Sequence, residues 1–343
     1  MSQRTALVIG AGAFGTSIAT ILAKSFKQVI VKVRSEDIYL AIRDQKENSV
    51  YLPGMKLADN ISAALEWDEV DALDKNEIEL IVSGLPTAGI SDYFRTNHQR
   101  FATYLKRSIP FVSLSKGIDP ESLELSDDLF FELFPNHKEL FTFLSGPSFA
   151  KEIMEEQITL VTLAGRSRKN LQAVSKMLEC PYFKALPSYD IKGVLLGGAL
   201  KNILAIAGGI IEGLGFNHNT RAAMITRGIA EMNRFGKVYN ARPETFYGLS
   251  GMGDLILTTT GDLSRNKRFG LDIAAGKKPE DIIASQRTVV EGYKTARAAH
   301  LVSAKYDIRA NIFNGLYEVL YENKDPRHVI QKIMTIPSRF ELD

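Results

Sequence analysis

The chain has 343 residues, with 45% hydrophobic and 24% charged side chains, which is typical of a globular protein large enough for two domains. Its net charge of +2, from 42 basic and 40 acidic residues, gives no electrostatic basis for binding nucleic acid. The one cysteine, Cys180, excludes an internal disulfide framework. Because no basic and then apolar leader precedes the first apolar run, we expect a cytoplasmic protein.

The first element is an apolar run from residue 5 that enters the spacing Gly-x-Gly-x-x-Gly and leaves as an amphipathic helix. In that context Gly10 can turn tightly, Gly12 can admit a pyrophosphate, and Gly15 can pack the helix on the sheet. The start of the helix then offers N–H groups to phosphates. We therefore expect a dinucleotide site here, the alternative being a strand, turn and helix without a ligand.

The second strand is expected over residues 28–33, and Arg34 and Ser35 follow it. An arginine at this point suits the 2′-phosphate of NADP, whereas NAD sites usually carry an acid for the ribose hydroxyl. NADPH is therefore favoured, although Glu36 and Asp37 are close enough along the chain to leave NAD open. A solvated charge at a strand end is the alternative interpretation of Arg34.

Five more apolar runs indicate strands, within residues 80–86, 111–117, 143–150, 158–164 and 182–186. In a parallel sheet, ligands bind outside the carboxyl ends of the strands. Lys116 and the turn that carries Gly146, Ser148 and Ala150 come at such ends, although a lysine there can also be a simple solubilising charge. The pattern predicts an α/β fold with an N-terminal Rossmann-like, doubly wound sheet over residues 1–190.

After Asp190 the pattern changes to long helical segments, without a Pro- or Gly-rich linker. The expected helices are 193–213, 219–238, 254–260, 266–275, 290–304 and 310–322. They predict an all-helical second domain over residues 191–343, which would bind substrate and carry the catalytic groups. The most apolar run, 194–211, contains a lysine and many glycines, so we interpret it as a core helix and not as a membrane span.

That lysine is Lys201, and its neighbours on the helix face are Gly197, Gly198, Ala205 and Gly208. Glycines are costly inside a helix, at about 1 kcal/mol each relative to alanine, so room for another backbone or a ligand is expected beside the amine. A lysine removed from water either pairs with a carboxylate or loses its proton more easily, as acid–base catalysts do. A purely structural ion pair is the alternative.

Three further sites in the helical region carry polar groups that could complete an active site. Asp254 begins a helix after a glycine turn, either as a cap or as the partner carboxylate of Lys201. Ser264, Arg265 and Asn266 together suit a phosphate monoester, although alone they would be read as a solvated helix start. Glu291 places a carboxylate at the start of another helix. The five histidines have no metal-ligand spacing, so no metal is expected.

Together these motifs resemble the bacterial-type NAD(P)-dependent glycerol-3-phosphate dehydrogenase family from about residue 5 to residue 325. The matching segments are Gly-Ala-Gly-x-x-Gly-Thr at 10–16, Tyr-Leu-Pro-Gly at 51–54, Ser-Lys-Gly at 115–117, Gly-Pro-Ser-Phe-Ala-Lys-Glu at 146–152, Leu-Lys-Asn at 200–202, Thr-Arg-Gly at 226–228, Gly-Met-Gly-Asp at 251–254, Ser-Arg-Asn at 264–266 and Val-Glu-Gly at 290–292. Each segment alone is weak, but their order is specific.

The resemblance implies an oxidoreductase that interconverts sn-glycerol 3-phosphate and dihydroxyacetone phosphate by hydride transfer with NAD(P)H, and so supplies phospholipid synthesis. It implies that Lys201 is the proton donor and acceptor, with Lys116 and Asp254 beside it. The substrate positions it implies are Lys116, Gly146, Ser148, Lys201, Asp254, Ser264, Arg265 and Asn266. The cofactor positions are Gly10, Gly12, Ala13, Phe14, Gly15, Arg34, Lys116, Ala150, Arg265, Val289 and Glu291.

The sequence departs from the family at two places on the adenine side of the cofactor site. Ala13 and Phe14 stand where serine and tryptophan or tyrosine are usual, and Lys32 stands where tryptophan is common. These departures concern the fit of the adenosine and the preference between NAD and NADP. They do not touch the residues implied in the chemistry.

Two other functions compete with this interpretation. The first is a β-hydroxyacid or ketopantoate-type NADP-dependent reductase, whose carboxylate substrate would not require the phosphate set around Arg265. The second is a dinucleotide-sensing protein without catalysis, which would not need Lys116 and Lys201 near one carbonyl. For partners we expect a small phosphorylated substrate, no nucleic acid and no integral membrane segment, with a homodimer as the candidate assembly.

Overall fold

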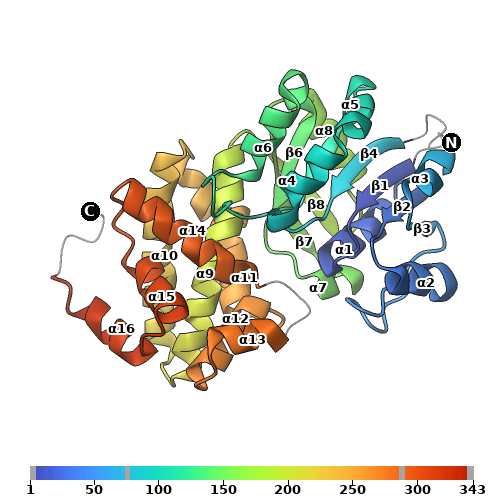
Figure 1. The fold of residues 1–343 in the computed structure, drawn as a ribbon. Helices are drawn as coiled ribbons and strands as arrows, with labels where there is room; N and C mark the ends of the chain where they lie inside the picture. Colours follow the sequence, from blue (N-terminus) through green and yellow to red (C-terminus); the bar gives the residue numbers. More distant parts are fainter. Residues whose placement is uncertain (1–4, 74–77, 286–289, 338–343) are drawn as a thin grey trace. The chain divides into compact units, whose positions relative to one another are not determined.

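The computed structural model describes residues 5–73, 78–285 and 290–337, and the chain forms two compact units (Figure 1). The sheet unit comprises Met1–Ser115 and Asp127–Ile191. The helical unit comprises Lys116–Ser126 and Lys192–Asp343. The short segment after the fifth strand therefore brings Lys116 into the same unit as Lys201.

The sheet has eight strands in the order β3-β2-β1-β4-β5-β6-β7-β8, and only the pairing of β6 with β7 is antiparallel among the described strands. The strands are β1 (Thr5–Ile9), β2 (Gln28–Lys32), β3 (Ile61–Ala64), β4 (Ile78–Ser83), β5 (Phe111–Ser113), β6 (Phe141–Ser145), β7 (Thr159–Gly165) and β8 (Phe183–Ser188). The predicted fold class, a Rossmann-like sheet followed by a helical domain, is confirmed. Strand β3 was not predicted, because its four residues, Ile-Ser-Ala-Ala, carry almost no periodic signal.

Helices connect the strands of the sheet unit and flank the sheet (Figure 1). They are α1 (Ala13–Leu22), α2 (Glu36–Gln45), α3 (Trp67–Leu73), α4 (Thr87–Thr96), α5 (His98–Lys106), α6 (Ser126–Leu133), the 3-10 helix η1 (Pro135–Leu140), α7 (Ala150–Met154) and α8 (Arg168–Met177). Strand β1 is fully buried, as expected for a parallel strand that is covered on both faces. Because β1 lies between β2 and β4, the chain reverses its direction of travel across the sheet here, which opens a ligand crevice at the carboxyl ends.

The helical unit is built around the 23-residue helix α9 (Ile191–Gly213) (Figure 1). The other helices are α10 (His218–Val238), η2 (Pro243–Tyr247), the π-helical turn η3 (Leu249–Gly253), α11 (Asp254–Thr260), α12 (Arg265–Ala274), α13 (Pro279–Ser285), α14 (Glu291–Lys305), α15 (Asn311–Tyr321) and α16 (Pro326–Met334). Helix α9 is long and apolar enough to cross a membrane, but its whole apolar window is buried within the described structure. It is the core helix that the sequence predicted.

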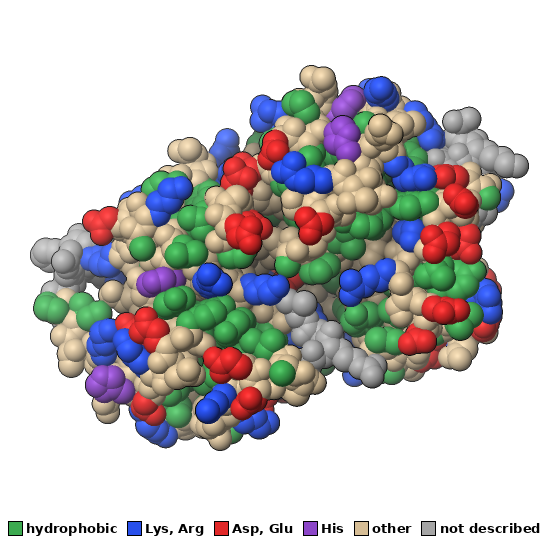
Figure 2. Space-filling view, viewed as in Figure 1, with side chains coloured by type: hydrophobic (Ala, Val, Ile, Leu, Met, Phe, Trp, Pro, Cys, Tyr) green, Lys and Arg blue, Asp and Glu red, His purple; other side chains and the backbone are tan. Residues whose placement is uncertain are grey.

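The surface carries charges of both signs. On the face shown in Figure 2, lysine and arginine side chains are interspersed with aspartate and glutamate side chains, which agrees with the small net charge.

The free thiol of Cys180 is buried.

The glycines of α9 allow other backbone segments to approach the helix closely. A Cβ at Gly197 would lie 2.5 Å from the Ser250 carbonyl oxygen, and a Cβ at Gly209 would collide with the Lys267 carbonyl. At Gly208, by contrast, a Cβ would meet only side-chain atoms of Thr259 and Met224, at 3.4 and 3.5 Å. The space predicted beside the lysine face is therefore filled by backbone at Gly197.

This difference predicts unequal stability effects for two identical substitutions on one helix. Gly197→Ala should lower the free energy of unfolding by about 2 kcal/mol or more, because the Ser250 backbone cannot move aside as a flexible side chain can. Gly208→Ala should be neutral or slightly stabilising, since its neighbours are at ordinary contact distance and alanine favours a helix by up to about 1 kcal/mol. Urea denaturation followed by circular dichroism measures both, and equal losses would contradict the packing described.

Candidate active site

The glycine-rich turn between β1 and α1 has the local geometry of a dinucleotide-binding loop. Gly10 has φ +94°, a left-handed conformation that favours glycine, and a Cβ at Gly15 would collide with the Gly10 carbonyl. At Gly12 no atom lies within 4 Å of where a Cβ would be. These three positions match the tight turn, the close packing and the open approach that a pyrophosphate requires.

Asn48 holds this turn in place, although no pattern in the sequence marks it. Its side chain is buried, and its Nδ2 donates to the Ala11 carbonyl and to Thr16 Oγ1, both at 2.8 Å. Helix α1 begins at Ala13, and its N-cap residue, Gly12, has no side chain with which to cap it. The turn therefore fits a dinucleotide, whose phosphates would lie at the start of α1.

The adenosine end of such a cofactor would lie beyond the end of β2, where Arg34 and Ser35 lead into α2. Arg34 is exposed, and so are Glu36 and Asp37 in the first turn of the helix. One cation and two carboxylates are therefore accessible at this corner for a ribose hydroxyl or its 2′-phosphate.

The turn after β6 is also shaped by a glycine. Gly146 has φ +148°, and a Cβ there would lie 2.8 Å from the Cα of Val161 on β7. The hydroxyl of Ser148 donates to the Gly146 carbonyl at 2.8 Å, and Ala150 begins helix α7. The turn therefore has a fixed shape at the carboxyl end of β6, where a glycine is required for close packing against β7.

In the helical unit, one carboxylate binds two lysines. Lys201 Nζ lies 2.5 Å from Asp254 Oδ1, and Lys116 Nζ lies 3.4 Å from Asp254 Oδ2. The exposed fractions of the side chains are 1% for Asp254, 9% for Lys201 and 11% for Lys116. Asp254 is thus the partner carboxylate of Lys201, and the two ammonium groups are positioned by its two oxygens.

The electrostatics of this cluster favour a lysine that titrates near neutral pH. Burial lowers the pKa of Lys201 to about 8, since removal from water disfavours the charged form. Asp254 acts in the opposite direction, and the positive charge of Lys116 lowers the pKa further. An amine with this pKa can both give and accept a proton at physiological pH.

A chain of amide groups joins α9, at the residue next to Lys201, to the starts of α12 and α14. Asn202 Nδ2 donates to Glu291 Oε2 at 3.3 Å, and Asn266 Nδ2 donates to Asn202 Oδ1 at 3.0 Å. The backbone N–H of Gly292 donates to Asn266 Oδ1 at 3.1 Å. The predicted substrate residue Asn266 therefore has both ends of its amide engaged, and Asn202, which was not predicted as a site residue, connects the two segments.

Glu291 is the second carboxylate in this region. Burial raises its pKa, while the positive charges of Arg265, Lys116 and Lys201 act against the rise. Glu291 is the first residue of α14, as the sequence indicated. Val289, a predicted cofactor position, lies outside the described residues.

Ser264 and Arg265 mark the beginning of α12. The buried hydroxyl of Ser264 caps the helix by accepting a hydrogen bond from the Lys267 N–H at 3.2 Å. Arg265 is the first helical residue and is exposed. An exposed guanidinium at a helix N-terminus is well suited to an anion. Ser264 therefore has a structural role as the N-cap of α12, in addition to any contact with a ligand.

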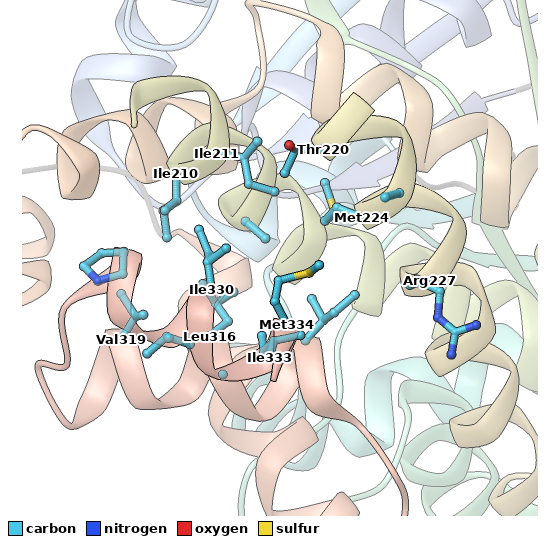
Figure 3. Close-up of a pocket in the computed structure, with 16 residues that line it drawn as sticks. Ile210, Ile211, Thr220, Met224, Arg227, Leu316, Val319, Ile330, Ile333 and Met334 are labelled. Atoms are coloured by element: carbon cyan, nitrogen blue, oxygen red, sulfur yellow. The ribbon is translucent and has the colours of Figure 1, made fainter. Parts of the chain in front are cut away.

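A cavity of about 190 Å³ lies between α9, α10, α15 and α16, and none of these charged residues lines it (Figure 3). Thr220 and Arg227 are the polar members among its described lining residues, and the others are apolar or glycine. Such a lining offers little to bind a phosphate.

Within the described residues, no group of three or more His, Cys, Asp or Glu side chains could hold a metal ion.

Comparison with known proteins gives one consistent family. The family descriptions that match are "NAD-dependent glycerol-3-phosphate dehydrogenase N-terminus" over residues 5–171 and "NAD-dependent glycerol-3-phosphate dehydrogenase C-terminus" over residues 190–331. The chain is 41% identical to the glycerol-3-phosphate dehydrogenase [NAD(P)+] of Solidesulfovibrio magneticus, covering 96% of this chain and 97% of the relative. It is 38% identical to that of Syntrophotalea carbinolica, covering 98% and 99%. The crystal structure of glycerol-3-phosphate dehydrogenase from Coxiella burnetii superposes with a TM-score of 0.87 at 26% identity, covering 98% and 100%.

Proposed function

The chain belongs to the NAD-dependent glycerol-3-phosphate dehydrogenase family, and from this premise we propose that it interconverts sn-glycerol 3-phosphate and dihydroxyacetone phosphate. As a member it is an oxidoreductase that uses NAD or NADP. The roles of individual residues, the preference for NADPH and the supply of glycerol 3-phosphate to phospholipid synthesis are parts of the proposal.

One observation carries the proposal: the buried Lys201–Asp254–Lys116 cluster is joined to the Arg265 segment by the hydrogen bond between Asn202 and Asn266. Lys201 and Asn202 are adjacent in sequence, and so are Arg265 and Asn266. This bond, together with the electrostatic influence of Arg265, Lys116 and Lys201 on Glu291, supports a single site in which a proton carrier and a phosphate-binding group would act on a phosphorylated ketone.

Arg265 is proposed to bind the phosphate of the substrate. A guanidinium can donate to two phosphate oxygens at once, and the N-terminus of α12 adds positive electrostatic potential. Binding energy from this non-reacting phosphate would hold the ketone in line with the lysines. In the sheet unit, Gly146 and Ser148 are proposed substrate contacts, and Ala150 a cofactor contact.

In ketone reduction, the bound nicotinamide supplies a hydride to C2, and the protein supplies charge and a proton. Lys201 and Lys116 would stabilise the negative charge that develops on the carbonyl oxygen. Lys201 would then transfer its Nζ proton to that oxygen, which leaves the alcohol and a neutral amine. Asp254 keeps both ammonium groups oriented, and in the reverse direction the neutral Lys201 would accept the hydroxyl proton.

The two alternative functions are not favoured. A ketopantoate-type reductase acts on a carboxylate and would have no use for the Arg265 segment, and a sensor would have no use for the lysine cluster. A cytoplasmic location remains part of the proposal, and so does a homodimer, which light scattering during size-exclusion chromatography measures. The direct test of function is NADPH oxidation with dihydroxyacetone phosphate, ketopantoate and unphosphorylated dihydroxyacetone in parallel.

Lys201→Met should reduce kcat at least about 10²-fold, because the side chain keeps its approximate volume but loses the proton. The affinity for NADPH, measured by fluorescence titration, should hardly change. Lys237→Met, at an exposed position on α10, is the matched control and should keep full activity. Near-normal turnover of a folded Lys201→Met protein would remove Lys201 from its assigned role.

The direction of the reaction should invert the pH dependence. Reduction needs the protonated amine, so kcat/KM for dihydroxyacetone phosphate should be constant at low pH and fall as the pH rises through about 8. Oxidation of glycerol 3-phosphate needs the neutral amine, so its rate should rise through the same pH. Initial rates in both directions across pH 6 to pH 10 (roughly the accessible range) check this. Two parallel profiles would argue against Lys201 as the proton carrier.

Arg265→Lys should reduce kcat/KM for dihydroxyacetone phosphate strongly, because lysine cannot reproduce the bidentate contact with a phosphate. Activity on unphosphorylated dihydroxyacetone, already poor, should change far less. Arg268→Lys, one turn along the same helix face and also exposed, is the matched control. NADPH affinity is measured alongside, since Arg265 also belongs to the proposed cofactor contacts. An equal proportional loss on the two ketones would mean that Arg265 does not bind the phosphate.

A further inference from the structure

Lys32, the last residue of β2, ties together the ends of two strands at the carboxyl edge of the sheet. Its Nζ donates to the Val33 carbonyl at 3.0 Å and to the Leu65 carbonyl at 2.5 Å. Val33 leads into the turn that carries Arg34, and Leu65 follows directly after β3. Two of the three donors of this ammonium are therefore used to fix the backbone on either side of the proposed adenosine site.

The side chain of Lys32 is also held by an aromatic ring. Its Nζ lies 5.6 Å from the centre of the Trp67 ring, and the guanidinium of Arg100 lies 4.5 Å from the same ring. Both distances are in the range of cation–π attraction. The ammonium is therefore engaged by the protein, which favours a fixed charge over a mobile side chain that reaches out to a ligand.

The carboxylate of Glu69 also holds the backbone near Lys32 in place. Glu69 Oε2 accepts the N–H of Leu65 at 2.6 Å and that of Glu66 at 3.3 Å, and Glu69 Oε1 accepts the hydroxyl of Tyr39 on α2 at 3.1 Å. The turn after β3 is thus joined to the end of β2 through Lys32 and to helix α2 through Glu69. We therefore expect a substitution at Lys32 to shift the backbone that follows β2 and the backbone that follows β3.

The charge balance of this corner is unfavourable for a 2′-phosphate unless Lys32 is positive. The acidic residues here are Glu36 and Asp37 in the first turn of α2, Glu66 just before α3, and Asp68 and Glu69 in the first turn of α3. The basic residues are Arg34, Lys32 and Arg100, and Arg100 already pairs with Asp71. Burial lowers the pKa of Lys32 while Glu66 and Glu69 raise it, so the ammonium is electrostatically coupled to these two carboxylates. Without the Lys32 ammonium, the charges of Glu66 and Glu69 would be less well offset.

We propose that Lys32 is a positioning residue that sets the coenzyme preference in favour of NADPH, because it fixes the backbone that presents Arg34 and offsets the charge of Glu66 and Glu69. It does this without contacting the 2′-phosphate. The inference rests on the proposed role of Arg34 in the cofactor site. It assigns a function to a position at which this chain departs from the family it resembles.

The test compares two lysines that make the same kind of contact at opposite ends of β3. Lys46 Nζ donates to the Asp59 carbonyl at 3.0 Å and to the Ile61 carbonyl at 2.8 Å, at the amino end of the strand. Lys32→Met should weaken NADPH binding about tenfold, as loss of one nearby charge in a partly screened site does, and leave NADH binding within about twofold. Lys46→Met should leave the ratio of the two affinities unchanged. Fluorescence titration with each reduced coenzyme gives the Kd values, and kcat at saturating NADPH should stay at the parent value.

Two further variants separate charge from folding and guard against a Lys32→Met protein that does not fold. Lys32→Arg keeps the charge and should keep most of the NADPH preference, whereas Lys32→Gln keeps a donor for the carbonyls but should lose that preference. An equal loss of NADPH and NADH affinity in Lys32→Met, or an unchanged ratio in both Lys32→Met and Lys32→Gln, would overturn the inference.

The variant Arg34→Asp is measured in parallel. It shows whether a negative result at Lys32 means that the role of Lys32 is wrong or that the proposed cofactor site is wrong. If Arg34→Asp shifts the preference towards NADH and the Lys32 variants do not, the cofactor site stands and the role of Lys32 is wrong. If neither position shifts the ratio, the placement of the 2′-phosphate at the end of β2 is wrong, and the inference about Lys32 falls with it.

Discussion

The helical unit depends on one buried carboxylate that serves two lysines. Asp254 gives one oxygen to Lys201 and the other to Lys116, so a site with two positive charges is held together by a single negative one. Removing ions from water is costly, and such a cluster persists only when packing holds each group in place. The surrounding elements do this: α9 supplies Lys201, the turn η3 leads into Asp254, and the 116–126 segment brings Lys116 into the same unit. The net charge of +1 that remains is what a developing alkoxide would neutralise.

Much of the fold was predictable because its signals are local in sequence. The roles of Gly10 and Gly15 followed from their spacing between a strand and a helix, and the structure has the positive φ and the close packing that this spacing implies. The helices of the second unit were predicted within a few residues of their bounds. Strand β3 and, in the second unit, helices α13 and α16 were missed because each is short, although α16 has a clear apolar face.

The parts of the site that were missed depend on contacts between distant segments. Asn48 lies 37 residues from Ala11, and Asn202 lies 64 residues from Asn266 and 89 from Glu291. An asparagine has no charge and no periodicity to mark it, so its partners become visible only in three dimensions. Lys201 could be singled out because a charge inside an apolar helix is anomalous by itself. Its partner Asp254 could be named only as one of two interpretations.

The contact between α9 and α12 has a consequence for which substrates can be accommodated. The two helices meet through backbone, since a Cβ at Gly209 would collide with the Lys267 carbonyl and a Cβ at Gly270 with the Ile206 carbonyl. Lys201 and Arg265 are carried by these two helices, so their separation depends on a main-chain contact that any side chain at Gly209 or Gly270 would force apart. Lys201 and Arg265 would therefore select substrates in which the reacting oxygen and the phosphate are a fixed distance apart. Enlarging the substrate range by protein engineering would have to begin elsewhere in the helical unit, because neither helix can be moved outward without breaking this crossing.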